Sequence, residues 1–153
     1  MKLTDALLGE HGVFYAAFGR LEAELPDLDD ACAVREQAAL LAAALVSHAQ
    51  IEDELLFTEL GRRGTGFEDL VKAMFDQHEH IASLLARVQD GGDAAQCREP
   101  LLEAVQLARD HFAREEKVAF PLAEGVLGDG TLELLGEEWA RRRTVWLGEA
   151  VRS

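Results

Sequence analysis

The 153-residue chain is poor in proline, the strongest helix breaker, and in the residues that favour strands. It has only three prolines, and β-branched residues are scarce beside Ala, Leu and Glu, which favour helix. This balance predicts an all-α fold. The length suits one domain with one sizeable core, so we expect a single domain over residues 1–153.

Positive charge is scarce as well. Fifteen Lys and Arg stand against 29 Asp and Glu, which gives a net charge of −14. Such a surface repels phosphate backbones and anionic lipids, so we expect no nucleic-acid partner and no membrane partner. The chain also lacks any apolar run of about 18 residues, the length that a membrane-spanning helix needs.

Cysteine is rare, and the N-terminus lacks the features of a signal peptide. Cys32 and Cys97 are too far apart to form a CxxC motif, so we expect neither a zinc knuckle nor a redox pair. The first ten residues include acidic side chains and no long apolar core. We therefore expect a cytoplasmic protein with reduced thiols.

Four turn-rich stretches divide the chain into long segments. They lie near Pro26 and at GRRGTG (61–66), DGGD (90–93) and GVLGDG (125–130). Between them the apolar residues recur at steps of three or four, which predicts helices over 3–24, 30–61, 67–89 and 95–123. Because short turns join long helices, neighbouring helices should run antiparallel. The prediction is an up-down-up-down four-helix bundle over about residues 3–124.

A fifth segment follows the predicted bundle. Residues 131–150 are amphipathic and contain Trp139 and Trp146. We expect a short additional C-terminal helix that caps one end or side of the bundle. A dimer contact is the alternative, because exposed Trp also suits interfaces, and the oligomeric state stays open.

Polar groups interrupt the apolar face of every predicted bundle helix. Each face carries one histidine, and the second and fourth helices add a glutamate four residues after it. The six residues are His11, His48, Glu52, His78, His111 and Glu115. Four residues along a helix give about 40° of rotation and about 6 Å of rise, so each His and its Glu project from one face. Because burying such groups unpaired is costly, a cation among them is the economical explanation.

The number of candidate ligands favours two ions. Four imidazoles and two carboxylates exceed the ligands of one tetrahedral zinc and suit two ions that share the carboxylates. Iron, manganese and zinc are all compatible with this ligand mixture. In an antiparallel bundle, all six side chains can meet near one end. A bundle with buried polar networks and no metal is the remaining alternative. The order His-x-x-x-Glu also differs from the Glu-x-x-His of ferritin-like proteins.

The pattern resembles the hemerythrin-like family, the HHE cation-binding domains. The matching stretches, in order, are GEHGVFYAAFGRLE, HAQIEDELLF, HEHIASLL and HFAREEKVAFPL, and the later EEWARRR is similar to the family's common end. The resemblance covers about residues 5–143. It implies a four-helix bundle with a non-heme di-iron centre, the same six ligands, and Glu52 and Glu115 as bridging carboxylates.

Two departures from the oxygen-carrying hemerythrins bear on function. Those proteins have two histidines one turn apart on the third helix, whereas the positions one turn either side of His78 are Met74 and Ala82. They also place the last carboxylate five residues after its histidine, which makes Glu116 the alternative to Glu115. The missing imidazole argues against reversible oxygen carriage and leaves room for a substrate at the metal.

Two other residues have both a structural and a functional interpretation. His80 lies about 200° around the helix from His78, so we expect it to be exposed, although EHI (79–81) mimics EHG (10–12) and a shifted register is the alternative. Tyr15 is the only tyrosine. We expect a core aromatic with a satisfied hydroxyl; the alternative is a hydroxyl that points at the open metal position. Four further polar residues are expected to be solvated or to support the ligands: Gln50, Asp53, Glu54 and Glu59.

The sequence therefore predicts a non-heme di-iron protein that acts on or senses a small oxidant, namely oxygen, nitric oxide or peroxide. A helix-lined apolar pocket would admit such molecules more readily than large polar ones. The alternative is a non-catalytic module for metal binding or for iron storage and supply. Zinc or manganese could substitute for iron, and whether the protein is an enzyme stays open.

Overall fold

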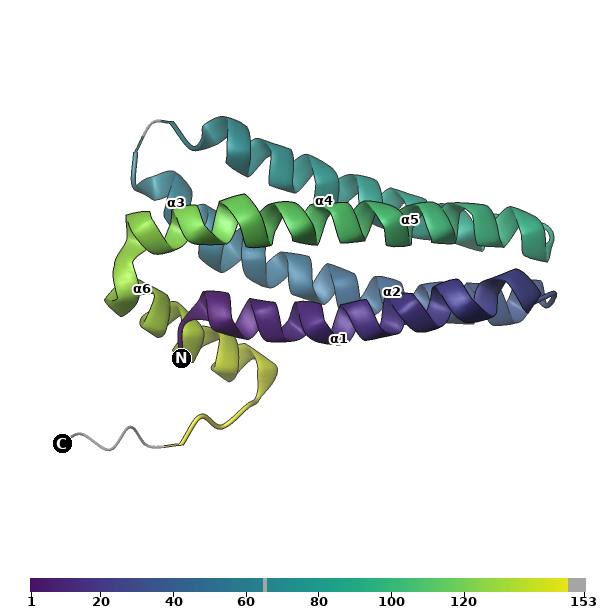
Figure 1. Ribbon diagram of the computed structural model, residues 1–153, viewed down its shortest axis with the longest axis horizontal. Helices are drawn as coiled ribbons and strands as arrows, with labels where there is room; N and C mark the ends of the chain where they lie inside the picture. The colour runs from purple at the N-terminus through teal and green to yellow at the C-terminus, as the bar shows by residue number, and fades with distance from the viewer. Residues whose placement is uncertain (65, 149–153) are drawn as a thin grey trace.

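The protein is all-helical, as predicted. The computed structural model describes residues 1–64 and 66–148, which form helices and no strand. Four helices of 21 or 22 residues form the bundle: α1 (Leu3–Glu24), α2 (Ala31–Ile51), α4 (Glu68–Gln89) and α5 (Ala94–Arg114). They lie side by side in an elongated helical bundle (Figure 1). Within these residues, no helix is both long enough and apolar enough to cross a bilayer.

Capped, short turns join the long helices. The one-turn helix η1 (Leu25–Asp27) contains Pro26 near its N-terminus, where a missing backbone N–H costs little. Asp30 then caps α2 by accepting a hydrogen bond from the backbone N–H of Cys32. Asp93 and Gln96 form a capping box at the start of α5. These two turns lie at one end of the bundle, and the N-terminus lies at the other (Figure 1).

Two helices continue into a wider turn that begins at the glutamate of each His-x-x-x-Glu motif. The π-helical turns are η2 (Glu52–Phe57) and η3 (Glu115–Ala119). A π-turn closes its hydrogen bonds over one residue more than an α-turn, so it rotates the residues that follow. Val118, which the α-helical period places on the apolar face, is therefore 48% exposed, while Ala119 and Phe120 are buried instead.

The last helix is kinked and ends earlier than predicted. The short helix α3 (Thr58–Arg62) follows η2. The last helix is α6 (Phe120–Arg143), which follows η3. The predicted break over 125–130 contains a sharp kink: Gly128 leaves helical geometry (φ 73°, ψ 164°), and two helical segments meet there. The predicted end at 150 is wrong, since Thr144 takes a left-handed φ of 55°. Residues 149 and 150 lie outside the described residues.

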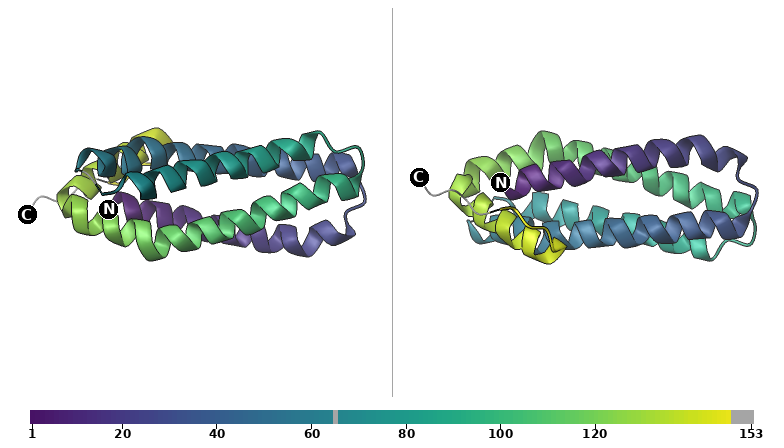
Figure 2. Two further views of the ribbon diagram at one scale, coloured as in Figure 1. Left: turned by 90° about the horizontal axis from the view of Figure 1, so that it is seen from above. Right: turned by 90° about the horizontal axis from the view of Figure 1, so that it is seen from below.

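After the kink, α6 turns back along the bundle and packs against α1 (Figure 2). Gly136 is needed there, because a Cβ at this position would collide with the backbone of Met1. Trp139 packs half-buried against the core, whereas Trp146, beyond the helix, is exposed. The segment of α6 after the kink therefore covers one side of the bundle, along α1.

The apolar core consists of two clusters that leave a polar layer between them. One cluster includes Phe14, Phe18, Leu85 and Phe112, and the other includes Leu3, Leu7, Phe57 and Met74. Along α1, α2 and α4, the histidine falls between residues of the two clusters, and on α5 His111 lies directly before Phe112, where the first cluster ends. The helices therefore bring these residues to one level of the bundle.

Candidate metal centre

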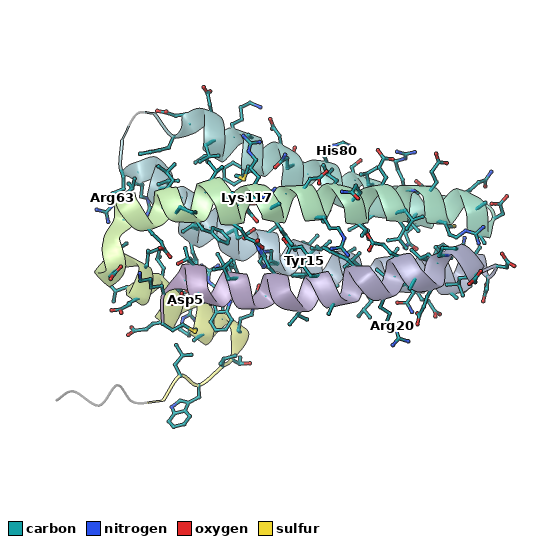
Figure 3. The ribbon with its side chains drawn as sticks, in the orientation of Figure 1. Asp5, Tyr15, Arg20, Arg63, His80 and Lys117 are labelled. Carbon is teal, nitrogen blue, oxygen red and sulfur yellow. The ribbon has the colours of Figure 1, made fainter. Side chains whose placement is uncertain are left out.

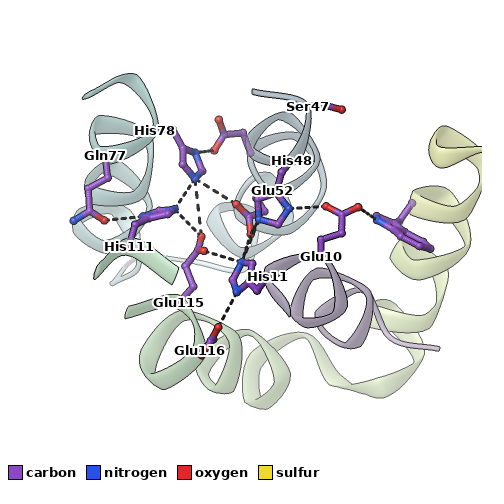
Figure 4. Close-up of polar contacts among 12 residues, drawn as sticks. Glu10, His11, Ser47, His48, Glu52, Gln77, His78, His111, Glu115 and Glu116 are labelled. Carbon is purple, nitrogen blue, oxygen red and sulfur yellow. Dashed lines mark hydrogen bonds and ion pairs between the residues drawn. The ribbon is translucent and has the colours of Figure 1, made fainter. Parts of the chain in front are cut away.

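The six predicted residues meet in one buried group between the four long helices (Figure 4). We call this group the His/Glu cluster; it consists of His11, His48, Glu52, His78, His111 and Glu115. Five of the six are at most 2% exposed, and the side chain of His78 is 8% exposed. Side chains from α1, α2, α4 and α5, together with the first residues of η2 and η3, thus converge at one point.

The His/Glu cluster contains two overlapping sets of potential metal ligands. One set is His11 and His48 with both glutamates, and the other is His78 and His111 with the same glutamates. The Nε2 atoms are 3.2 Å apart in the first histidine pair and 2.8 Å apart in the second. Two imidazoles bound to one ion at about 2.1 Å would hold their nitrogens about 3.0–3.4 Å apart, depending on the angle at the ion. Each histidine pair is therefore close to the spacing of neighbouring ligands.

The carboxylates of Glu52 and Glu115 have no hydrogen-bond donor among the described residues. Within the described residues, Oε1 and Oε2 of both Glu52 and Glu115 are buried and accept no hydrogen bond. Imidazole Nε2 atoms do approach them, at 3.1–4.0 Å. Buried polar atoms are almost always hydrogen-bonded, and an unpaired buried carboxylate is strongly disfavoured. Cations between the carboxylates and imidazoles would satisfy all four oxygens, so the donor set fits a metal site.

The outer nitrogen of every cluster imidazole also has a partner. Each Nδ1 lies 2.6–3.0 Å from a side-chain oxygen: His11 faces Glu116, His48 faces Glu10, His78 faces Asp53 and His111 faces Gln77. Because these oxygens accept hydrogen bonds, Nδ1 of each imidazole donates. In the neutral ring, the lone pair of Nε2 is then left pointing into the cluster. Such partners fix the tautomer and the orientation of metal-bound histidines.

The outer partners reveal two equivalent halves in the chain. Glu10 and Gln77, each directly before a cluster histidine, bond the histidine of the following long helix. Asp53 and Glu116, each directly after a cluster glutamate, bond the histidines of the opposite half. The helices α1 and α2 with η2 therefore supply the same parts as α4 and α5 with η3.

The cluster has a high affinity for positive charge. Burial opposes protonation of His11, but Glu115 and Glu52 outweigh it and raise the pKa of His11 to about 9. Burial is likewise outweighed by carboxylates at the next two histidines, so the pKa of His48 rises to about 10 and that of His78 to about 9. Burial also opposes ionisation of Glu52, yet the imidazoles hold the pKa of this carboxyl well below its usual range.

The remaining candidates lie outside the cluster. His80 is exposed on α4, as expected (Figure 3). Tyr15 is half-buried, and its hydroxyl donates to Glu116 Oε1 over 2.9 Å, so it is satisfied as expected and does not point at the metal ligands. Burial and this carboxylate raise the pKa of Tyr15 to about 12. Glu116 belongs to neither ligand set and supports His11 instead, which favours Glu115 as the ligand.

Two residues of the centre are not identified by the sequence pattern. Glu10 and Gln77 lie off the apolar faces, where a polar residue is normally solvated, so helical periodicity gives no reason to select them. The only signal is their position immediately before His11 and His78.

A cavity reaches the cluster from the side of α2 and α4. It has a volume of about 190 Å³, and its lining is mainly apolar. Three cluster histidines, His48, His78 and His111, lie in its wall. So does Ala82, one of the two positions where an oxygen carrier would have a further histidine. The other position, Met74, is fully buried in the core.

Comparison with known proteins agrees with this site. A protein-family model for the hemerythrin HHE cation binding domain matches residues 2–123 and 69–138. Neither the search of curated proteins nor the search of solved structures gave a match. The family model covers most of the chain, including every residue of the His/Glu cluster. The chain therefore belongs to the hemerythrin HHE cation-binding domain family.

Proposed function

We propose that the protein holds two non-heme iron ions and acts on or senses a small oxidant. The observation that carries this proposal is the four buried carboxylate oxygens of Glu52 and Glu115, which have no hydrogen bond in the described part of the chain. The ligands would be the six residues of the His/Glu cluster, with the glutamates shared by both ions. The up-down-up-down helix order is part of the proposal, because it would bring early and late helix positions to one level.

The protein's own contribution would be to orient ligands and exclude water. Iron, when bound, supplies redox chemistry that no side chain of the cluster has. The outer partners fix each imidazole with Nε2 inward. The ring of Phe112 stacks on that of His11, with centroids 3.8 Å apart and planes 10° apart, and restricts its rotation. These contacts hold the ligand set in place on rigid helices.

The size of the cavity beside the cluster supports the proposal that the ligand is a small molecule. Its volume of about 190 Å³ suits oxygen, nitric oxide or peroxide better than a large polar substrate. Ala82 contributes only a methyl group where a further imidazole could otherwise lie. Space for an external ligand next to His78 and His111 favours reaction or sensing over a fully ligated, inert centre.

The test begins with metal identification and an absorption spectrum of the protein as purified. The reduced protein is then titrated separately with oxygen, nitric oxide and hydrogen peroxide. We expect iron and spectral changes with at least one of the three. A metal-loaded protein that stays unchanged with all of them would instead favour the non-catalytic module for metal binding or iron storage.

A cavity-filling variant separates ligand access from metal binding. Ala82→Leu adds bulk to the cavity wall without changing any of the six proposed ligands. We expect full metal content and a slower reaction with the small oxidant. The matched control is His80→Ala, an exposed position on the same helix, which should react like the unaltered protein.

A further inference from the structure

Glu10 joins the His/Glu cluster to the C-terminal helix. Its Oε2 accepts from His48 Nδ1 over 2.6 Å. Its Oε1 accepts from Trp139 Nε1 and from Arg143 Nε, each over 2.8 Å, and Arg143 Nη2 adds a bond of 3.1 Å to Oε2. The carboxylate therefore lies between His48 of α2, which Figure 4 shows beside it, and two residues of α6.

Arg143 also reaches α2 directly beside the cluster. Its guanidinium donates to the hydroxyl and to the backbone carbonyl of Ser47, the residue before His48. Arg143 forms part of the wall of a mainly apolar hollow of about 300 Å³, which Glu10 also lines. Without this side chain, Glu10 would lose two of its donors and become more open to solvent.

The two halves of the centre differ at the position of Glu10. The equivalent partner is Gln77, whose amide oxygen accepts from His111 Nδ1 over 2.8 Å and carries no charge. Glu10 is a carboxylate, and Arg143 offsets its charge. Three hydrogen bonds donated from α6 hold the Glu10 carboxylate in place beside His48.

We propose that Trp139 and Arg143 are positioning residues of the metal centre: they hold Glu10, and Glu10 holds the ring of His48 with Nε2 toward the ions. This inference rests on the metal binding proposed above. It assigns a role to the EEWARRR stretch, residues 137–143, which contains both donors, and links it to the GEH stretch around Glu10.

The test is the rate at which zinc(II) leaves the fully loaded protein for an excess of a chromophoric chelator. In Glu10→Ala we expect one of the two ions to leave about 10- to 100-fold faster, because the outer partner of His48 is gone. In Arg143→Gln the same ion should leave about 10-fold faster, since Glu10 remains but loses its support. The second ion should keep its rate in both variants.

A double variant distinguishes positioning from general stabilisation of the bundle. If Arg143 acts through Glu10, Glu10→Ala with Arg143→Gln should release zinc no faster than Glu10→Ala alone. If the two substitutions accelerate zinc release independently, so that their fold-changes multiply in the double variant, the proposal is overturned, because Arg143 would then act by another route than Glu10. An unaltered release rate in Arg143→Gln would also overturn it.

Arg142→Gln is the matched control. Arg142 lies on the same turn of α6 and bonds Glu54 and Glu138, with no bond to Glu10. The Arg142→Gln variant should release zinc at the rate of the unaltered protein. An acceleration equal to that of Arg143→Gln would overturn the proposal. Circular dichroism checks that every variant keeps its helices.

Glu10→Gln keeps an oxygen that can accept from His48. Its rate of zinc release should therefore lie between those of the unaltered protein and of Glu10→Ala.

A spectroscopic measurement reads His48 directly. In the ¹⁵N-labelled, zinc-loaded protein, Arg143→Gln should shift the Nδ1–H resonance of His48 and leave that of His111 in place. An unmoved His48 resonance contradicts the inference. A chain that takes up neither iron nor zinc contradicts the proposed function and the inference together, whereas equal release rates in all variants contradict only the inference.

Discussion

Glu52 and Glu115 are the two side chains whose burial is hardest to explain without a cation. Each is fully buried, and each lies within reach of imidazoles without accepting a hydrogen bond from any described residue. An ordinary buried carboxylate is paired or hydrogen-bonded, since desolvation of an unpaired charge costs several kcal/mol. Both glutamates belong to both ligand sets, so their loss should affect two ions rather than one.

Removing either glutamate should reduce metal content. Glu52→Ala and Glu115→Ala are each expected to lower the content from two ions per chain to one or fewer, because each carboxylate is shared between the two sets. Elemental analysis of purified protein measures this ratio. His80→Ala, at an exposed position, should keep both ions. Full metal content in both Glu variants would show that the ligand assignment is wrong.

The histidines give the metal-free protein a distinctive dependence on pH. Their folded pKa values, about 9 for His11 and His78 and about 10 for His48, lie above the unfolded value of 6.5. Their stabilising contribution is therefore complete below about pH 6.5 and is lost as pH rises toward 10. We expect the melting temperature of the metal-free protein to fall across this range.

Metal should reverse this trend, because protons compete with the ions for Nε2. The melting temperature of the zinc-loaded protein is expected to rise from pH 6 to pH 8. Differential scanning calorimetry of both forms at several pH values measures the two slopes. Parallel slopes in the two forms would contradict the assignment of these imidazoles to the metal.

The sequence identifies the cluster residues but not their outer partners, for a physical reason. His48 and Glu52 interrupt an apolar face, and burial of such groups demands an explanation. Glu10 and Gln77 lie on faces where polar residues are usual, so nothing in the periodicity marks them. Only the packing of α6 on α1 brings Trp139 to Glu10, and such long-range contacts have no local signal.

The π-turns are the elements that helical periodicity predicts least well. The apolar spacing before and after η3 is helical on both sides, so the sequence reads as one α-helix. One extra residue per turn then changes which side chains are buried, and this is why Val118 is exposed and Phe120 is not. Both π-turns begin at a cluster glutamate, which places the register change at the proposed metal centre.

The kink in α6 makes a prediction about glycine. Gly128 has a conformation that is almost restricted to glycine, so Gly128→Ala should lower the free energy of unfolding by about 1–3 kcal/mol. Gly125→Ala is the control, because this glycine is helical and has open space around its Cβ position. It should stabilise the protein by about 0.5–1 kcal/mol. Urea unfolding measures both, and equal effects would contradict a required kink.

Across the whole molecule, bound ions should stabilise the bundle. Each ion present at about 100 times its dissociation constant adds about 2.7 kcal/mol to the free energy of unfolding. Two ions should therefore raise the melting temperature by about 10–20 °C for a domain of this size. The measurement is a thermal melt before and after chelation and dialysis. A melting temperature that does not change on metal removal would contradict a metal centre that joins four helices.

The charge of the molecule bears on its partners. With a net charge of −14, the surface disfavours polyanions and attracts cations. The cytoplasmic location and the lack of a nucleic-acid or membrane partner stay predictions. The family assignment rests on the match over most of the chain, and the fold agrees with it in its four long helices and buried His/Glu cluster.

Anomalous X-ray diffraction at the absorption edge of the bound metal tests the two-ion centre most directly. We predict two peaks per chain, one between the Nε2 atoms of His11 and His48 and one between those of His78 and His111. Both peaks should lie within bonding distance of Glu52 and Glu115. A single peak, or peaks outside the His/Glu cluster, would contradict the shared dinuclear site.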